Sequence, residues 1–370
     1  ERTPCLDGVE IEGAHPEADG IELTGTMQPI LTRISVRNAR HGIVLTSRNR
    51  NVVIDNCHLY DNRGVGILFD KLNLHQVNIT HDGRLVLSTD HGWLVCLERD
   101  FSSYKAIQVP GAAEQAAAHC ARMEAERGNT AYGWVRTSMC TDDEGGIYIS
   151  SVDHTHRVVW TGERLSTDPA DGAWSAEYRN GAGTGSGTTP SLMGFGDNED
   201  RFVVIGDGDD VVNITLLWRD EIPENWEQLP NAPSRRIAGI GPADMGDSDL
   251  PTIQTEQSIT VSGYGAMTVN NEPASTPDWL PERGARMLSF FLGHDPAYTP
   301  HGLHKYEWDP ETRSLREAWV NTEVSSPNSV PYVSRGSDLV YTCGVRDGKW
   351  TIEAVDWSTG ESAGWWVVGD

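Results

Sequence analysis

Two carboxylates are the best candidates for acid–base chemistry in this sequence. Asp142 and Glu256 lie in polar segments that lead into apolar, strand-like runs. Hydrolysis of a glycoside normally needs two carboxylates with opposite protonation roles, so these two are the candidate catalytic residues. No sequence motif identifies them as a pair, because two other acidic residues, Asp143 and Glu144, directly follow Asp142 and are equally possible candidates.

Polar residues in the same kind of segment are suited to binding. The segments are "VRTSMCTDDEGG", "GSGTTPSLMGFG", "TIQTEQSIT" and "SSPNSVPYVS", and the candidate residues are Arg136, Thr188, Thr189, Gln257 and Asn328. Amides, hydroxyls and one guanidinium suit a sugar or a carboxylate, since each ligand hydroxyl needs a placed partner. The alternative is that these side chains satisfy backbone groups where strands begin.

Histidines offer a different chemistry. His294, His301 and His304 fall within eleven residues in "GHDPAYTPHGLH", and "DHTH" adds His154 and His156. Imidazoles from different loops can hold a transition metal with open positions for substrate. The alternative is that they are ordinary histidines of surface loops.

Acidic side chains dominate the charge of the chain. Its 370 residues include 54 acidic and 29 basic ones, a net charge of -25, which repels phosphate backbones and anionic membrane surfaces. Nucleic acid is therefore not expected as a partner. Residues 81–370 carry -23 of this charge, so the chain divides into two modules of different character.

Two clusters of aspartates could bind calcium through oxygen ligands, although neither has the spacing of an EF-hand. Turns rich in aspartate explain them equally well, and solubility is the simplest explanation of the overall charge. The clusters are Asp207, Asp209 and Asp210, and Asp244, Asp247 and Asp249.

The sequence says little about compartment. It has no run of about eighteen apolar residues, so no membrane span is expected, and "ERTPCLDGVE" lacks the regions of a signal peptide. Either the protein is cytoplasmic or the chain is a processed or partial product, which would favour an extracellular or periplasmic location. The six cysteines form no CxxC pair, and Cys120 with Cys140 is the one candidate disulfide.

Three phrases, "GIEL" at Gly20, "GIVL" at Gly42 and "GILF" at Gly66, recur at intervals of 22 and 24 residues. This period is typical of one coil of a parallel β-solenoid, and further apolar sets lie between the phrases, the last being Leu74, Val77 and Ile79.

The segment resembles the right-handed parallel β-helix proteins, the architecture of pectate lyases and many polysaccharide depolymerases. The resemblance implies glycan-directed carboxylates and basic residues on exposed rungs. Asp55, Asp61 and Lys71 could serve here, or they could be solvated corner charges.

After Thr80 the pattern changes to pairs of alternating strands. "HDGRLVLSTDHGWLVCLERD" matches "DEGGIYISSVDHTHRVVWTG" at an offset of 62 residues. Steps near sixty residues suit the four-stranded blades of a β-propeller. The first strands are predicted near Leu85, Ile147, Val203, Ile259 and Leu339, and the Ala-rich stretch near 111–128 is predicted to be an inserted helix.

The last copy, "AVDWSTGESAGWWVV", resembles the repeats of quinoprotein-like propellers, with Asp356, Thr359, Gly360 and Trp365 at the motif positions. The other copies carry the motif poorly, so a quinone cofactor is not inferred from it.

These patterns predict an all-β chain: a short right-handed parallel β-solenoid over 1–80, then a β-propeller over 81–370. Five blades are recognisable, which make either a compact ring or a ring that lacks one or two blades. The leading functional hypothesis is recognition, with or without breakdown, of a carbohydrate or similar polyhydroxylated ligand. The alternatives are a non-catalytic protein-interaction scaffold and a metal-dependent lyase or oxidoreductase.

Overall fold

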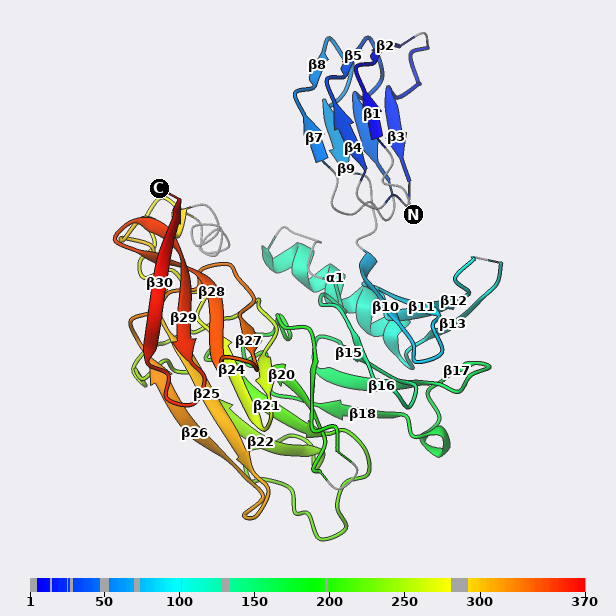
Figure 1. Ribbon diagram of the computed structural model, residues 1–370. Coiled ribbons are helices and arrows are strands. Elements are labelled where there is room, and N and C mark those ends of the chain that lie inside the picture. The colour runs from blue at the N-terminus through cyan, green and yellow to red at the C-terminus, as the bar shows by residue number, and fades with distance from the viewer. Residues whose placement is uncertain are drawn as a thin grey trace. The chain divides into compact units, whose positions relative to one another are not determined.

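A computed structural model describes residues 5–13, 15–24, 26, 29–46, 53–69, 74–100, 102–127, 133–196, 199–280 and 292–369. The chain divides into two compact units, Glu1–His75 and Gln76–Asp370, each considered by itself (Figure 1). Most of the regular structure is β. In the described ranges the α-helical part is α1 (Ala112–Arg127), and no helix there is long and apolar enough to cross a membrane.

Short parallel strands build the first unit. Its described strands are β1 (Cys5–Asp7), β2 (Glu10–Glu12), β3 (Ile21–Leu23), β4 (Ile30–Thr32), β5 (Ser35–Arg37), β6 (Ile43–Leu45), β7 (Val53–Asp55), β8 (His58–Tyr60) and β9 (Ile67–Phe69). They form three parallel sheets, ordered β1-β4-β7, β2-β5-β8 and β3-β6-β9. The parallel pairing expected from the repeated phrases is therefore present.

Close backbone approach explains why the first two phrases begin with glycine. A Cβ on Gly20 would lie 2.6 Å from the carbonyl oxygen of Gly42, and one on Gly42 would lie 2.5 Å from that of Gly66. Real Cβ atoms do not approach so closely, so a larger residue would push the rungs apart. The isoleucine that follows each glycine is also stacked, since Ile43 pairs with Ile21 of one rung and Ile67 of the other in a parallel register.

The end of the first unit differs from the prediction. Leu74, Val77 and Ile79 belong to strand β10 (Leu74–Ile79), which pairs with an antiparallel sheet of the second unit instead of adding a rung. The two compact units divide between His75 and Gln76, five residues before the predicted boundary at residue 80. Their apolar alternation is the same in either sheet, so it could not assign the strand.

The second unit is a succession of antiparallel sheets, here called blades 1 to 5 (Figure 1). Blade 1 contains β10, β11 (Leu85–Thr89), β12 (Trp93–Leu97) and β13 (Tyr104–Gln108). Blade 2 contains β14 (Cys140–Thr141), β15 (Gly146–Ser150), β16 (His154–Trp160), β17 (Leu165–Ser166) and β18 (Trp174–Glu177), with the short 3₁₀ helix η1 (Pro169–Asp171) between the last two. Blade 3 contains β19 (Ser191–Met193), β20 (Phe202–Gly206), β21 (Asn213–Trp218) and β22 (Ile237–Pro242). Blade 4 contains β23 (Thr260–Ser262), β24 (Gly265–Val269), β25 (Leu303–Asp309) and β26 (Ser314–Asn321). Blade 5 contains β27 (Tyr332–Ser334), β28 (Leu339–Arg346), β29 (Lys349–Asp356) and β30 (Ser362–Gly369).

Hydrogen bonds join the first strands of successive blades. Asn78 of β10 donates to the backbone oxygen of Met139 at 3.1 Å, and Ser191 of β19 donates to that of Ile259 at 2.7 Å. Thr260 of β23 donates to the backbone oxygen of Pro331 at 3.1 Å. The first strands therefore lie side by side at the inner ends of the blades, which is the arrangement of a β-propeller.

The strand positions correct one part of the prediction. Leu85, Ile147, Val203 and Leu339 lie in second strands. Blades 2, 3 and 5 begin with inner strands of two or three residues, which are too short to show an alternating pattern. Blade 1 begins with the six-residue strand β10, whose apolar residues had been assigned to the solenoid. The predicted outer strands of blade 4 in "HKYEWDPETRSLREAWVN" are β25 and β26, whereas most of "RMLSFFLG" lies outside the described residues.

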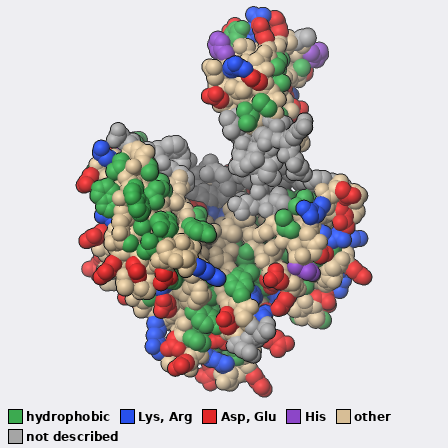
Figure 2. Space-filling view, in the orientation of Figure 1, with side chains coloured by type: hydrophobic (Ala, Val, Ile, Leu, Met, Phe, Trp, Pro, Cys, Tyr) green, Lys and Arg blue, Asp and Glu red, His purple; other side chains and the backbone are tan. Residues whose placement is uncertain are grey.

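Exposed apolar side chains gather on blade 5, where hydrophobic side chains form a patch (Figure 2). Tyr332 of β27 and Trp366 of β30 are both largely exposed. On blade 1, Trp93 and Tyr104 are exposed as well.

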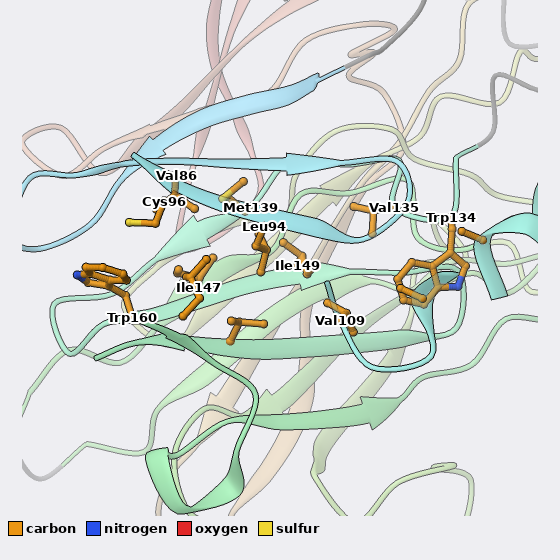
Figure 3. Close-up of a cluster of buried hydrophobic side chains, with 14 residues drawn as sticks. Val86, Leu94, Cys96, Val109, Trp134, Val135, Met139, Ile147, Ile149 and Trp160 are labelled. Atoms are coloured by element: carbon orange, nitrogen blue, oxygen red, sulfur yellow. The ribbon is translucent and has the colours of Figure 1, made fainter. Parts of the chain in front are cut away.

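Apolar packing fills the space between neighbouring blades. Between blades 1 and 2, Leu94 and Ile149 lie fully buried in one cluster with Trp134 and Trp160 (Figure 3). The helix predicted near 111–128 is α1, and its Ala112 joins this cluster. Each buried aliphatic side chain of this kind contributes about 1.5–3 kcal/mol through burial.

Candidate functional site

An ion pair links the inner ends of blades 2 and 4. Arg136 precedes β14 and Glu256 precedes β23, and Nη2 of the arginine lies 2.6 and 2.7 Å from the two carboxylate oxygens. The side chains are 12% and 28% exposed, so the pair is largely removed from water. The arginine also donates to the backbone oxygen of Thr184, which lies in the segment before β19.

Further hydrogen bonds extend this contact into a network, here called the inner cluster. The amide of Glu256 donates to Oδ1 of Asn271 at 2.7 Å, and Nδ2 of Asn271 donates to the backbone oxygen of Pro327 at 3.1 Å. The amide of Ser138 donates to Oγ1 of Thr189 at 3.1 Å. Segments before β14, β19, β23 and β27 thus meet, although they lie up to about 190 residues apart in the chain.

Three buried oxygens in these segments are unpaired within the described part of the chain. They are Oγ of Ser138, Oε1 of Gln257 and Oγ of Ser325. Their residues lie before the first strands of blades 2, 4 and 5 and are at most 7% exposed. Buried polar atoms normally have a partner, so these three oxygens are exceptions among the described residues.

The structure places the predicted binding residues unequally. Arg136 and Thr189 belong to the inner cluster, and Gln257 follows its member Glu256 in the chain. Thr188 is fully buried, and its Oγ1 accepts from the amide of Gly206 at 2.8 Å, so it supports the backbone of blade 3. Asn328 is exposed in the loop that precedes β27.

The two predicted catalytic carboxylates are not brought together. Asp142 follows β14, whereas Arg136, the partner of Glu256, precedes it. Its carboxylate accepts from Tyr148 Oη and from the amides of Gly146 and Glu144 at 2.6–2.9 Å. Burial alone would raise the pKa of Asp142, but these hydrogen bonds hold it below its usual value. Asp142 therefore fixes its own turn, while Glu256 pairs with Arg136.

The three predicted metal-binding histidines have separate surroundings. The His294 ring lies 6.0 Å from that of Trp350, and His301 Nδ1 lies 3.1 Å from the backbone oxygen of Glu323. His304 is fully buried in β25, with Nε2 3.1 Å from Glu317, and burial lowers its pKa. Across the described ranges, no group of three or more His, Cys, Asp or Glu side chains could hold a metal ion. The predicted metal site is therefore not formed.

The two histidines of "DHTH" have structural roles. His156 is buried between Ser151 and Ser175, and burial lowers its pKa to about 3. His154 instead pairs with Asp153 at 2.9 Å, which raises its pKa.

The aspartate clusters serve turns and ion pairs. Asp207 accepts from the backbone amide and Nδ2 of Asn213 at 2.9 and 2.7 Å, and Asp209 pairs with Arg179 at 2.7 Å. Asp244 accepts from the amide of Gly246. These contacts are those of aspartate-rich turns, the alternative that the sequence left open.

The predicted disulfide is absent, because Cys120 and Cys140 are both free thiols. In the first unit, Asp55 ends β7 and Asp61 occupies a left-handed corner with φ of 51°, whereas Lys71 lies outside the described residues.

Sequence reasoning missed Ser138, Asn271 and Ser325. The two serines stand in the quoted polar segments "VRTSMC" and "SSPNSV" but carry no pattern that separates them from their neighbours. Asn271 follows a strand instead of preceding one, so no rule about strand starts could select it.

Comparison with known proteins gives relatives for both units. Residues 3–83 match the model of the right-handed β-helix region family. An uncharacterised protein of Archaeoglobus fulgidus is 35% identical over 293 residues, which cover 77% of this chain and 52% of the relative. The chain thus spans about half the length of this curated relative.

Solved structures similar to this chain include propellers. BamB from Moraxella catarrhalis has a TM-score of 0.46 at 11% identity, covering 84% of this chain and 67% of that one. The Dos1 propeller has a TM-score of 0.47 at 8% identity, covering 81% and 59%. Because these TM-scores are low, the assignment of a β-propeller rests on the order of the strands in each sheet and on the contacts between first strands. The chain contains a β-helix region followed by a β-propeller.

Proposed function

We propose that the second unit is a binding module whose inner cluster recognises a polyhydroxylated ligand such as a carbohydrate. The observation that supports this proposal is the set of three buried oxygens without a partner in the described residues, on Ser138, Gln257 and Ser325. Leaving a buried polar atom unpaired costs about 1–3 kcal/mol. Ligand hydroxyls can donate to such oxygens and remove that cost.

The charge of the inner cluster favours a neutral ligand. The positive charge of Arg136 is already matched by Glu256 at hydrogen-bond distance. A carboxylate ligand would have to compete with Glu256 for the guanidinium, whereas a neutral sugar would not. Of the two ligand classes that suit these residue types, the sugar is therefore preferred.

The proposal is limited to recognition. Breakdown of a glycoside by an acid–base pair needs two carboxyl groups that face one substrate, whereas Asp142 accepts from Tyr148 and Glu256 pairs with Arg136. The quinoprotein-like motif has a structural explanation too, since Asp356 accepts from the amides of Ser358 and Thr359 and so holds the last turn of blade 5. We therefore propose neither a quinone nor a transition metal here.

A glycan array followed by calorimetry on the full chain tests the proposal. We expect Ser138→Ala and Ser325→Ala each to weaken binding of a captured glycan by about tenfold, which corresponds to about 1.4 kcal/mol. Ser88→Ala is the matched control, because Ser88 is also buried with an unpaired Oγ in the described residues but lies in β11. Equal affinities for all three variants, or no glycan captured, would refute it.

A protein-interaction scaffold is the second candidate. The specific observation that favours it is the run of four exposed apolar residues, 365–368, in β30. Exposed apolar surfaces of this kind mark sites of contact with another protein.

A further inference from the structure

A buried arginine of blade 2 has no close polar partner among the described residues. Arg157 of β16 is 9% exposed, and its Nε has no hydrogen-bond partner there. Its Nη1 lies 3.5 Å from the backbone oxygen of Arg219 and 3.5 Å from Oδ1 of Asp220, and its Nη2 lies 3.7 Å from Oδ2 of Asp142. Hydrogen bonds between a guanidinium and a carboxylate normally measure about 2.7–2.9 Å, so this buried cation is poorly neutralised.

Three neighbouring arginines add positive charge around Asp220. Nη1 of Arg201 lies 3.6 Å from Oδ2 of Asp220, so Arg157 and Arg201 flank one carboxylate at long distance. Arg236 donates to the backbone oxygen of Asp220 at 2.6 Å, and burial together with repulsion from Arg157 lowers the pKa of Arg236 to about 10. Arg219 is 3% exposed, and its Nε also lacks a partner in the described residues. Positive charge is therefore concentrated here, in a chain with a net charge of -25.

Aromatic rings support three of these guanidinium groups. The pairs, with the distance from the guanidinium carbon to the ring centre, are Arg157 with Tyr148 at 5.8 Å, Arg219 with Phe195 at 5.5 Å and Arg236 with Trp174 at 4.4 Å. A guanidinium that stacks on a ring keeps the N–H donors of its edge, and these donors match the oxygens of a carboxylate or phosphate. The arginines are thus held in position before any ligand arrives.

We propose that a small oxyanion, a carboxylate or phosphate group, binds between Arg157 and Arg201 in the place that Asp220 occupies. The side chain of Asp220 is 37% exposed and lies 3.5 and 3.6 Å from the two guanidinium groups, so it can turn toward solvent when an anion enters. A free anion is not tethered to the backbone and can approach both groups at about 2.7–2.9 Å. Gly172 leaves room beside Arg157, because a Cβ there would lie 3.8 Å from Nη1.

The surroundings limit the size of the ligand. Arg201 also pairs with Glu144 at 2.8 Å, and Asp142 faces Arg157. These carboxylates and the net charge of -25 repel polyanions such as nucleic acid, so the ligand carries one compact anionic group. The site uses residues that follow β14 and β21, whereas the residues of the inner cluster that meet from blades 2, 3, 4 and 5 mostly precede first strands. The two sites share no residue.

Isothermal titration calorimetry of the full chain tests the site, with inorganic phosphate and acetate titrated separately at constant ionic strength. We expect saturable binding of at least one of the two anions, and the tighter one identifies the ligand group. Asp220→Asn removes the competing carboxylate and should tighten binding by about tenfold. Arg201→Gln should weaken binding by about tenfold or more. Arg201 is chosen because its side chain is 20% exposed, so its replacement disturbs the fold less than that of Arg157.

An exposed ion pair of blade 4 supplies matched controls. Arg316 pairs with Asp309 at 2.9 Å, and Arg316→Gln and Asp309→Asn change the net charge by the same amounts as the test variants. Both controls should bind the anion as the wild type does, and equal effects in blade 4 and at the site would overturn the proposal.

Absence of saturable binding to the wild type and to Asp220→Asn would also overturn the proposal and leave water as the bridge across the long contacts of Arg157. Ser138→Ala, which tests glycan recognition at the inner cluster, should leave anion binding unchanged. The two proposals can therefore fail separately.

Discussion

The blades are joined in two regions that use different chemistry. Between the faces of blades 1 and 2, Leu94 and Ile149 pack in a cluster without charged members. At the inner ends, Arg136 and Glu256 connect blades that are not neighbours in the chain. Apolar contact is non-directional and stabilises any close packing, whereas hydrogen bonds require particular positions. The faces thus supply most of the stability, and the inner ends fix which segments meet.

The largest effect should come from the apolar region. Ile149→Ala would remove a fully buried side chain between blades 1 and 2, and we expect a loss of about 2–5 kcal/mol in the free energy of unfolding. Urea titration followed by circular dichroism measures it. Ile149→Val should cost only about 0.5–1.5 kcal/mol. Equal costs for the two variants would contradict the assignment of stability to packing.

A smaller effect is expected at the inner ends. Arg136→Ala would leave Glu256 without its partner in a site largely removed from water, at a cost of about 1.5–3 kcal/mol. Arg164 is the matched control, because it pairs with Asp171 at 2.8 Å but is 62% exposed. Its change to alanine should cost less than about 1 kcal/mol. If both variants unfold at the same urea concentration, burial does not distinguish the two ion pairs.

The last effect depends on pH and is expected at Asp207, in the turn between β20 and β21 of blade 3. Burial raises the pKa of this carboxyl to about 7, from 3.8 in an unfolded chain. The folded state therefore binds a proton more tightly, and stability falls as pH rises from about 4 to 7, by up to about 1.4 kcal/mol per pH unit.

The Asp207→Asn variant cannot ionise there and should lack this fall. Unfolding titrations at pH 5 and pH 8, compared between wild type and variant, isolate the contribution from those of the other carboxyls. A difference between the two proteins that does not change with pH would show that Asp207 is ionised in the folded state.

Much of the architecture was predictable because it repeats. The spacing of Gly20, Gly42 and Gly66 indicated parallel rungs, and the alternating runs at Leu85 and Ile147 indicated blades. The inner strands were not predictable from alternation, since β14 has only two residues. Their position had to be set by tertiary contacts, such as that of Thr141 with the backbone of Ile79.

The candidate site was also predictable only in part. Polar segments before inner strands were recognisable, but the pairing of Arg136 with Glu256 joins residues 120 positions apart and leaves no local pattern. The histidines show the opposite case. His301 and His304 are close in sequence, yet His301 lies before β25 against the backbone oxygen of Glu323, whereas His304 lies within β25 beside Glu317. Proximity in sequence therefore did not bring the two rings to one site.

The stacked glycines of the first unit have a consequence for how this protein can change over evolution. Gly20 and Gly42 each face the carbonyl oxygen of the next rung, which occupies the space that a side chain would need. A whole rung can therefore be duplicated or deleted as a block of 22 to 24 residues, provided that the block brings its glycine. A single substitution of Gly42, by contrast, would push its rung away from that of Gly66.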